Sequence, residues 1–448
     1  MSASFHVRAV ATMSLGGLLF GFDTAVISGV TAALHETWRI GPAMVGTLVS
    51  AALWGTLAGA VFSGAPGDRY GARAVLRLVA AAYLLSAIGC AVAAGPWTFF
   101  VSRLLGGLAI GASSVLVPVY IAEISPADRR GRLVGLFQFN IVFGILAAYF
   151  VNSLIGQVAP AEIAWRLKLA AAALPAMLFL VLLFGVPQSP AWLGMRGRRK
   201  EAEEVAQRLG LAEPATAQSL EDGSQRLSWS VHRRPIVLAV LLALFNQLSG
   251  INAILYYLND IFAAAGFGGL SADARAIAVG FANLLGTMAG IGLIDRIGRR
   301  PLLIAGGIVT AAALVGVALV FSDRLAAAWL LPLLVLFIIA FALSQGAVIW
   351  VYLSEIFPAA VRARGQALGS ATHWAANAVI SLMFPILAVG DRAAPFWVFA
   401  VFMLVQSVLV WRLFPETRRR ALGQLVGRMT PRDPAGDRRS AATNQAAV

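Results

Sequence analysis

The sequence contains one cysteine, Cys90, among its 448 residues. A single cysteine excludes a disulfide within the chain and any metal site built from several thiolates. The four histidines, His6, His35, His232 and His373, are dispersed and have no spacing that suits metal ligands. We also find no nucleophile–base arrangement and no ATP-binding loop. We therefore expect no metal, no cofactor and no catalytic residues, and we predict that the protein is not an enzyme.

Charged residues are also scarce, at 12% of the chain, whereas hydrophobic residues make up 59%. Soluble domains carry about a quarter charged residues, so this composition excludes an ordinary soluble protein. Apolar windows of about 20 residues, the length that crosses a bilayer core, recur along the chain. We place twelve spans near residues 9–31, 43–64, 74–95, 97–122, 131–156, 165–187, 235–262, 274–294, 301–321, 328–352, 365–389 and 394–414. Because such runs suit helices better than barrel strands, the predicted fold is an all-α membrane protein.

Acidic residues are outnumbered by Lys and Arg, 21 to 35, which gives a formal net charge of +14. The basic residues are scattered over short loops without aromatic platforms between them, so we expect no nucleic-acid partner. Most of them lie at the chain ends and in the even-numbered loops, which predicts cytoplasmic termini by the positive-inside rule. The first apolar run is too long for a cleavable signal peptide. The sequence thus predicts a multi-pass protein of the inner (plasma) membrane.

Three short motifs occur twice. The segments "DRYGAR" (68–73), "VYIAEISP" (119–126) and "VPQS" (186–189) return as "DRIGRR" (295–300), "VYLSEIFP" (351–358) and "FPET" (414–417). Three matched pairs at nearly equal offsets predict a duplicated six-helix half. Two such halves usually enclose a site at their interface, so the natural mechanism is alternating access.

The repeats also suggest domain boundaries. We predict a first six-helix bundle at residues 1–187, a cytoplasmic linker at 188–234, a second bundle at 235–415 and a cytoplasmic tail at 416–448. The linker segment "RRKEAEEVAQRLG" has the spacing of an amphipathic surface helix. The tail is polar and rich in Arg, Ala, Asp and Pro, which predicts disorder.

One carboxylate, Asp23, stands in the otherwise apolar first span, within "LLFGFDTAVISG". A charge at this depth is costly, so the carboxyl group must be protonated or paired with a cation. We take Arg103, in the fourth span, as the one cation inside the spans and expect it to contact Asp23. The pair is then either a fixed salt bridge that holds two helices together or a switch whose rearrangement loads and releases a proton.

Uncharged polar and aromatic side chains within the spans suggest a neutral polar ligand. Amides match the hydroxyl groups of a sugar without the cost of a buried charge, and rings pack against its C–H faces. The residues that fit this role are Gln138, Gln247, Asn252, Tyr256, Asn283, Trp350, Trp374 and Asn377. Each of them alone could instead serve helix packing or an interhelical hydrogen bond.

Taken together, the motifs resemble the sugar porter family of the major facilitator superfamily, which contains bacterial sugar/proton symporters and facilitative glucose carriers. The segments "GFDTAVISG", "DRYGAR", "RLLGGLAIG", "PVYIAEISPADRRGRL", "QLSGINAILYY", "DRIGRRPL" and "WVYLSEIFP" occur in the order and at the spacing of that family. The resemblance implies two six-helix bundles and sugar contacts for Gln138, Gln247, Asn252, Asn283, Trp350, Trp374 and Asn377, with Phe20 near the sugar. It also favours the proton switch, because proton-coupled members carry Asp at the position of Asp23 and facilitative carriers generally carry Asn.

Two departures from the family pattern fall in the predicted site. Asn246 precedes Gln247 where the family often has a second glutamine, and we retain it as a site residue. His373 stands before Trp374, where related sequences commonly carry a residue such as Gln. His373 either contacts the substrate and titrates between pH 5 and 8, or it is a neutral side chain bonded to a neighbouring helix.

Two further departures concern the backbone and the cytoplasmic charges. The segment "QGAVIW" (345–350) lacks a proline found in many members, which puts the usual break of the tenth helix in doubt. The segment "PQSPAW" (187–192) carries Gln188 and Ala191 in place of an acid and a base, so we expect a salt link to be missing there.

Charged residues at the predicted cytoplasmic helix ends form matched sets. They are Asp68, Arg69, Arg73, Glu123 and Arg130 in the first half and Asp295, Arg296, Arg300, Glu355, Arg362 and Arg364 in the second. We expect Glu123 to pair with Arg130, and Glu355 with Arg362 or Arg364. By resemblance, these charges form a gate that is closed in the outward-facing state. If they served only to fix topology, the arginines would be explained but not the matched acids.

The predicted function is import of a hexose, pentose or related polyol together with a proton. The expected partners are the monosaccharide, protons and the lipid bilayer, and we expect a monomer. Three alternatives remain open: a sugar uniporter, a proton-coupled carrier of another small polar metabolite, and a membrane sugar sensor that does not transport.

Overall fold

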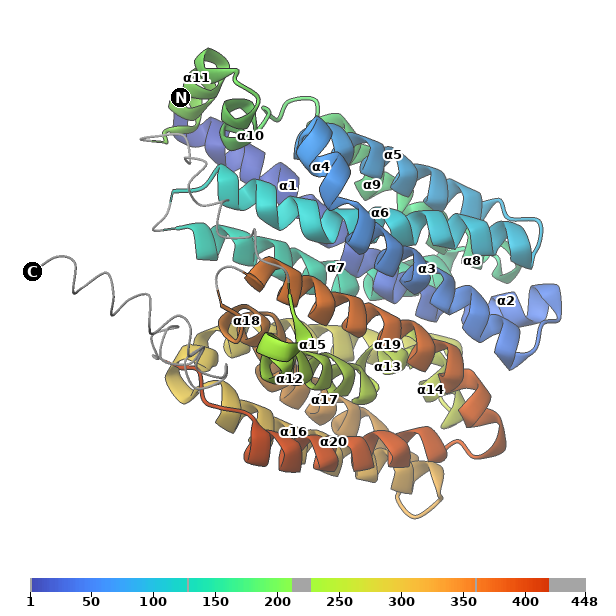
Figure 1. The fold of residues 1–448 in the computed structure, drawn as a ribbon. Helices are drawn as coiled ribbons and strands as arrows, with labels where there is room; N and C mark the ends of the chain where they lie inside the picture. Colours follow the sequence, from blue (N-terminus) through green and yellow to red (C-terminus); the bar gives the residue numbers. More distant parts are fainter. Residues whose placement is uncertain (1, 127–128, 212–226, 359–360, 419–448) are drawn as a thin grey trace, which may run out of the picture.

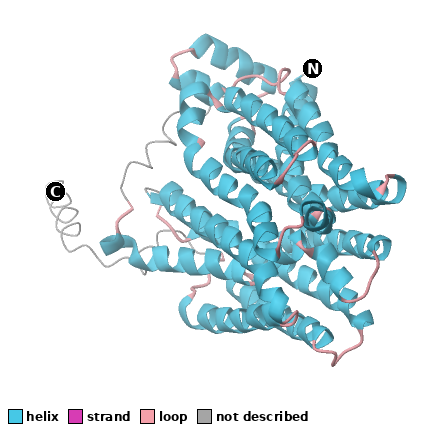
Figure 2. Cartoon of the chain, turned by 90° about the vertical axis from the view of Figure 1, so that its right-hand side faces the viewer, coloured by secondary structure: helices cyan, strands magenta, loops and turns pink. Residues whose placement is uncertain are grey.

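The computed structural model describes residues 2–126, 129–211, 227–358 and 361–418 (Figure 1). Within these ranges all regular elements are helices, as Figure 2 shows. In this described part of the chain, twelve stretches, each a single helix or a run of consecutive helical elements, are long and apolar enough to cross a membrane. Each predicted span falls on one of them, so the prediction of an all-α chain with twelve spans is confirmed.

The described part of the first half consists of nine helices and one 3₁₀ turn, and seven of these helices together with the turn make up six spans. These elements are α1 (Ser2–Val26) with η1 (Ile27–Gly29), α2 (Thr31–Trp38), α3 (Pro42–Phe62), α4 (Gly64–Tyr70), α5 (Ala72–Ala91), α6 (Pro96–Glu123), α7 (Arg130–Val158), α8 (Ala161–Ala171) and α9 (Ala173–Leu182). The linker forms α10 (Pro190–Met195) and α11 (Arg199–Leu209). Helix α11 buries Ala202, Ala206 and Leu209 on one face, which is the predicted amphipathic pattern.

The second half repeats the six spans. They are formed by α12 (Trp229–Leu248) with α13 (Ile251–Tyr256), α15 (Gly269–Ile297), α16 (Arg299–Phe321), η4 (Ala327–Trp329) with α17 (Leu330–Phe341), a π-helical turn (Ala342–Gly346) and α18 (Ala347–Glu355), α19 (Arg362–Gly390) and α20 (Ala394–Leu413). Helix α14 (Leu258–Ala264) connects the first two of these spans. The doubt about the tenth helix was misplaced, because the π-helical turn interrupts it between α17 and α18 without a proline.

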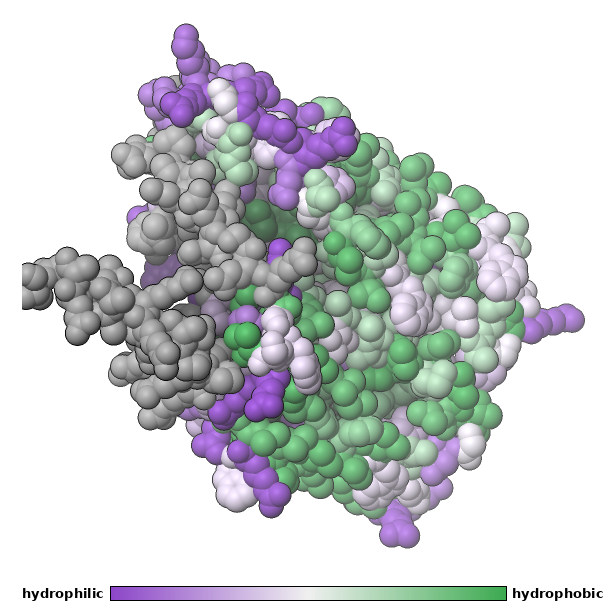
Figure 3. Space-filling view, in the orientation of Figure 1, coloured by the Kyte–Doolittle hydropathy of each residue, from purple (hydrophilic) through white to green (hydrophobic). Residues whose placement is uncertain are grey.

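The two halves lie one above the other in Figure 1, with α1–α9 in the upper half and α12–α20 in the lower. They meet where α3 packs against α19 and α7 against α15. The N-terminus, the linker helices and the C-terminal end of α20 lie at one end of the bundle, here called the terminal end. Helices α2 and α14 lie toward the opposite end, called the far end. A broad band of hydrophobic side chains separates the two ends on the face shown in Figure 3, which suits contact with lipid.

The motif repeats make similar contacts in the two halves. The guanidinium group of Arg73 donates to the carbonyl of Val186 at 3.3 Å, and Arg300 donates to the carbonyl of Trp411, three residues before Phe414, which is the counterpart of Val186. The hydroxyl groups of two repeated tyrosines likewise donate to the carbonyls of repeated prolines: Tyr120 to Pro187 (2.6 Å) and Tyr352 to Pro415 (3.0 Å). The duplication read from the sequence is therefore also a duplication of tertiary contacts.

Glycines allow the closest helix contacts in the first half. On α6, a side chain at Gly107 or Gly111 would collide with the backbone carbonyl of Ala52 or Thr56 on α3. Transmembrane helices use small residues in this way because their association depends on close van der Waals contact rather than on the hydrophobic effect. Helices α3 and α6 are thus fixed as a rigid pair.

Substitution Gly107→Leu is expected to prevent folding of the first half, because the new side chain meets backbone atoms that cannot move aside. Overpacking of this kind costs about 3 kcal/mol or more. Gly292→Leu is the matched control, since Gly292 is also helical and a Cβ atom at that position would meet no atom of another helix within 4 Å. Size-exclusion chromatography of detergent extracts should show loss of the monodisperse peak for Gly107→Leu only. An unchanged peak and melting temperature would contradict the assignment.

Candidate functional site

Two charged residues are paired within the membrane-spanning part of the first half. Arg103 on α6 donates from Nη1 to Oδ1 of Asp23 on α1 at 2.5 Å. The side chains are 4% and 13% exposed. The structure therefore brings together the two residues that the sequence analysis assigned to proton coupling. A charge-assisted bond at this depth is strong, and removing either partner would leave a buried unpaired charge.

A small cavity of about 10 Å³ adjoins this ion pair. Its lining includes Asp23, Arg103 and Phe20 from the first half and Tyr256 and Trp374 from the second. The volume is about that of one water molecule. The cavity therefore places the ion pair next to predicted sugar-binding residues of both halves.

Four polar side chains of the second half form one hydrogen-bonded network, in which Asn246, Gln247 and His373 are buried and Asn252 is half-buried. Gln247 on α12 accepts a hydrogen bond from Asn252 at 2.9 Å and donates to Asn246 at 3.2 Å. Its Nε2 also lies 3.0 Å from Nε2 and 3.2 Å from Nδ1 of His373 on α19. Since the amide nitrogen is a donor, the ring nitrogen that accepts its hydrogen bond carries no proton. In this conformation His373 is bonded to a neighbouring helix, which is the second of its two interpretations.

Aromatic rings line the same region. Trp374 lies 5.5 Å from Phe20 between ring centroids, which joins α19 of the second half to α1 of the first. His373 lies 5.1 Å from Trp374 and 5.2 Å from Trp350. Nearby, Asn377 donates to the hydroxyl of Tyr256 at 3.4 Å. Flat apolar rings beside amides provide the two surfaces that a sugar requires, one for C–H groups and one for hydroxyl groups.

The remaining predicted binding residues stand apart from the network. Gln138 on α7 is half-buried and Asn283 on α15 is 7% exposed. Within the described part of the chain neither side chain has a hydrogen-bond partner, so both amides are free to meet a ligand. Sequence reasoning did not include Gln345 of the π-helical turn, whose backbone carbonyl accepts a hydrogen bond from the side chain of Asn246 at 3.5 Å and whose own side-chain amide donates to the sulfur of Met403 at 3.1 Å. A buried glutamine in an apolar span was the available signal.

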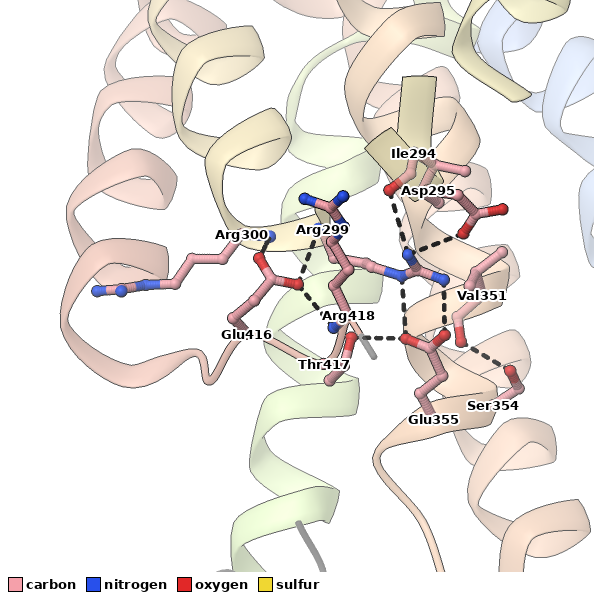
Figure 4. Close-up of polar contacts among 10 residues, drawn as sticks. All are labelled: Ile294, Asp295, Arg299, Arg300, Val351, Ser354, Glu355, Glu416, Thr417 and Arg418. Carbon is pink, nitrogen blue, oxygen red and sulfur yellow. Dashed lines mark hydrogen bonds and ion pairs between the residues drawn. The ribbon is translucent and has the colours of Figure 1, made fainter. Parts of the chain in front are cut away.

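The charges of the second half at the terminal end meet in the cluster shown in Figure 4. Glu355 accepts two bonds from Arg299, at 2.8 and 3.1 Å, and one from the hydroxyl of Thr417 at 2.5 Å. Arg299 also reaches Asp295 at 3.0 Å. The prediction that Glu355 pairs with Arg362 or Arg364 missed this partner, because Arg299 was left out of the predicted set. Arg299 precedes Arg300 in "GRR" and begins α16, so its side chain turns toward α18.

A helix cap also joins this cluster. Glu416 accepts hydrogen bonds from the backbone N–H groups of Arg299 and Arg300, at 3.1 and 3.0 Å, at the N-terminus of α16. In the first half the equivalent Gln188 instead donates to the carbonyl of Tyr70 at 3.2 Å. Where we expected a salt link to be missing, Gln188 thus makes an uncharged hydrogen bond to the backbone of Tyr70.

The other predicted gate residues lie at the same end. Glu123 is hydrogen-bonded by the hydroxyl of Ser189, as Glu355 is by Thr417. Asp68, Arg69 and Arg296 are exposed, and Arg362 is half-buried. The side chain of Arg130 lies outside the described residues, so its predicted pairing with Glu123 stays a prediction.

The duplicated halves, the buried ion pair between α1 and α6 and the polar site between the halves define a membrane carrier of the major facilitator type. The chain belongs to the family described as "Sugar (and other) transporter", which it matches over residues 9–425. This confirms the family predicted from the motifs, and the chain is a multi-pass protein of the inner membrane.

Similar proteins cover nearly the whole chain. The D-xylose-proton symporter of Escherichia coli (strain K12) is 32% identical over 476 residues, covering 95% of this chain and 96% of the relative. The arabinose-proton symporter of Bacillus subtilis (strain 168) is 33% identical over 441 residues and covers 95% of each. Among solved structures, the partially occluded inward-open form of the E. coli xylose transporter XylE has a TM-score of 0.84 at 32% identity, covering 93% of this chain and all of that one.

One assignment from the sequence was wrong. Arg103 was taken as the one cation inside the spans, but Lys168 lies within the sixth span, on α8, and is 8% exposed. It stands near the start of that span, after Arg166, where sequence alone does not separate a loop residue from a buried one.

Proposed function

We propose that this protein imports a monosaccharide together with a proton by alternating access, with Asp23 as the proton carrier. The observation that carries the proposal is the 2.5 Å Arg103–Asp23 ion pair beside a cavity that Tyr256 and Trp374 also line. Relatives named as xylose-proton and arabinose-proton symporters support the same substrate class.

The ion pair suggests how proton binding and sugar binding are coupled. Protonation of Asp23 neutralises it and weakens its attraction to Arg103, so α1 and α6 can then separate. Phe20 is one helical turn from Asp23 and contacts Trp374 of the opposite half. A movement of α1 therefore shifts Phe20 at the sugar site. In return, binding of a sugar changes the environment of the Asp23 carboxyl group.

The sugar is expected to replace bonds that the site makes with itself. Gln247 bonds Asn246, Asn252 and His373, so the hydrogen-bonding groups of its amide are satisfied within the protein. Hydroxyl groups of a sugar can donate and accept in place of these partners. His373, with one ring nitrogen accepting and the other donating, would serve as a neutral contact and select the pattern of hydroxyl groups.

The orientation and organisation follow from the same proposal. The terminal end is cytoplasmic, and the far end faces outward, since the basic residues gather near the termini and linker. Residues 1–187 and 235–415 act as the two moving units, joined by the linker at 188–234, and the protein acts as a monomer. The likeness to a partially occluded inward-open structure supports an inward-facing state for this conformation.

The proposal is tested with de-energised cells that express the protein. Pulses of individual hexoses, pentoses and inositols are added to a weakly buffered medium, and the external pH is recorded. Symport predicts alkalinisation with one or a few of these compounds, which identifies the substrate at the same time. Equilibration of a radiolabelled sugar without any pH change would instead establish a uniporter.

A further inference from the structure

A second set of buried polar residues joins the halves at the far end, away from the proposed sugar site. This far-end cluster consists of Ser28 and Lys168 from the first half and Asn259 and Asp273 from the second. Ser28, Lys168 and Asp273 are 1%, 8% and 6% exposed. Charges so deeply buried are rare unless something compensates for the loss of water.

The contacts of the cluster cross from one half to the other. Ser28 donates to the side-chain oxygen of Asn259 at 3.4 Å, and the amide nitrogen of Asn259 donates to Asp273. Lys168 donates to the backbone carbonyl of Gly29 at 3.0 Å. Each charged group is therefore anchored within its own half.

Gly156 on α7 allows the two charges to approach each other. The position that a Cβ atom would take at Gly156 lies 3.3 Å from Oδ2 of Asp273 and 3.7 Å from Nζ of Lys168. The two groups thus converge on one spot on α7, and they interact electrostatically. A side chain at residue 156 would contact both groups.

We propose that Lys168 and Asp273 form an electrostatic lock that holds the outward side of the protein closed and separates when that side opens. The inference rests on the proposed transport function for its orientation and for the movement of the halves. When the halves part, Lys168 leaves with Gly29, and Asp273 leaves with Asn259, so both charges enter water. In the closed state each compensates the other, and loss of one leaves the other buried and unpaired.

A third ionisable group at the far end, Asp260, determines the pH at which the test is done. Asp260 on α14 lies outside the membrane-spanning segments, and burial raises the pKa of its carboxyl group to about 6. A hydrogen bond from Thr31 and the charge of His35 oppose this rise. At pH 7.5 Asp260 is therefore mostly ionised, and measurements at this pH compare variants in one charge state.

The lock is tested by access from outside to a cysteine placed below it. The parent carries Cys90→Ala and Val49→Cys, because Val49 is 2% exposed and lines the small cavity beside Asp23. Right-side-out vesicles are treated at pH 7.5 with a maleimide that does not cross membranes. Lys168→Met and Asp273→Asn are each expected to raise the labelling rate about tenfold, because the unpaired charge favours the open state.

The double variant separates a charge lock from simple packing. Lys168→Met with Asp273→Asn should label more slowly than either single variant, since no unpaired charge remains. Lys168→Arg should label at a rate close to that of the parent. Arg166→Met is the matched control on the same helix, because the hydrogen bonds of Arg166 among the described residues go to the carbonyls of Ala91 and Ala93 in the first half. This control should leave labelling unchanged.

Labelling at the parental rate in both single variants overturns the proposal, as does a double variant whose effect is the product of the two single effects. If the single variants fail to fold, as judged by size-exclusion chromatography, recovery of folded protein in the double variant is the expected result and its absence contradicts the lock. Labelling requires no sugar. A negative result here is therefore distinct from failure to find a transported substrate.

Discussion

Asp23→Asn is expected to abolish proton-driven accumulation of sugar while exchange of sugar across the membrane continues. Asparagine has nearly the shape of aspartate but cannot take up and release a proton near neutral pH. With one proton per sugar, a gradient of one pH unit supports about tenfold accumulation in the wild type. The variant should reach a ratio of about 1 at any pH gradient, as measured in proteoliposomes with a radiolabelled substrate from the panel.

Counterflow gives the second readout for this variant. In vesicles preloaded with unlabelled sugar, Asp23→Asn should still take up labelled sugar, because the binding side chains remain. Asp323→Asn is the control: Asp323 is exposed at the far end and has a φ of 57°, a conformation that asparagine also tolerates. It should retain full accumulation. Loss of sugar binding in Asp23→Asn would return the Arg103–Asp23 pair to a purely structural role.

Gln247→Ala is expected to weaken sugar binding at least tenfold without uncoupling the proton. The change removes an amide that the sugar would engage and leaves Asn252 and His373 without their shared partner. Sites built to hydrogen-bond hydroxyl groups lose about 1–3 kcal/mol when a buried partner is left unpaired. Binding is measured by quenching of tryptophan fluorescence and transport by the concentration dependence of uptake.

A purely structural role of Gln247 would give a different result. It would lower the melting temperature and the maximal rate together while leaving the apparent affinity of the remaining folded protein unchanged. Gln207→Ala is the matched control, since Gln207 is an exposed amide on the linker helix α11. That variant should keep both affinity and stability. Unaltered sugar affinity in Gln247→Ala would remove this residue from the binding site.

Much of the architecture could be predicted because its signals are local. An apolar run of about 20 residues identifies a span wherever it stands in the chain, and a duplicated motif identifies equivalent positions without knowledge of their contacts. Arg73 and Arg300 are such a pair, and in the structure each bonds a carbonyl at the end of the last span of its own half. The contact of Asp23 with Arg103 was also predictable, since few charged residues stand deep in the spans.

Pairings among several similar candidates were not predictable. Arg362 and Arg364 were the partners expected for Glu355, whereas in the structure two N–H groups of Arg299 donate to its carboxylate. The irregularity in the tenth helix likewise arises from π-helical hydrogen bonding rather than from proline. The pairing of Glu355 depends on the angle at which a side chain leaves its helix, and the π-helical turn depends on the local backbone hydrogen bonds; motif spacing specifies neither.

The sequence by itself determined the number of spans, the duplication and the family, because hydropathy and motif order can be recognised without any knowledge of packing. Only the tertiary structure decided that Lys168 and Asp273 approach the same position on α7 at the far end, since they come from different halves and have no shared motif. Helix packing sets which distant side chains face each other, and a charge near the end of a span is exposed or buried according to the neighbour it meets.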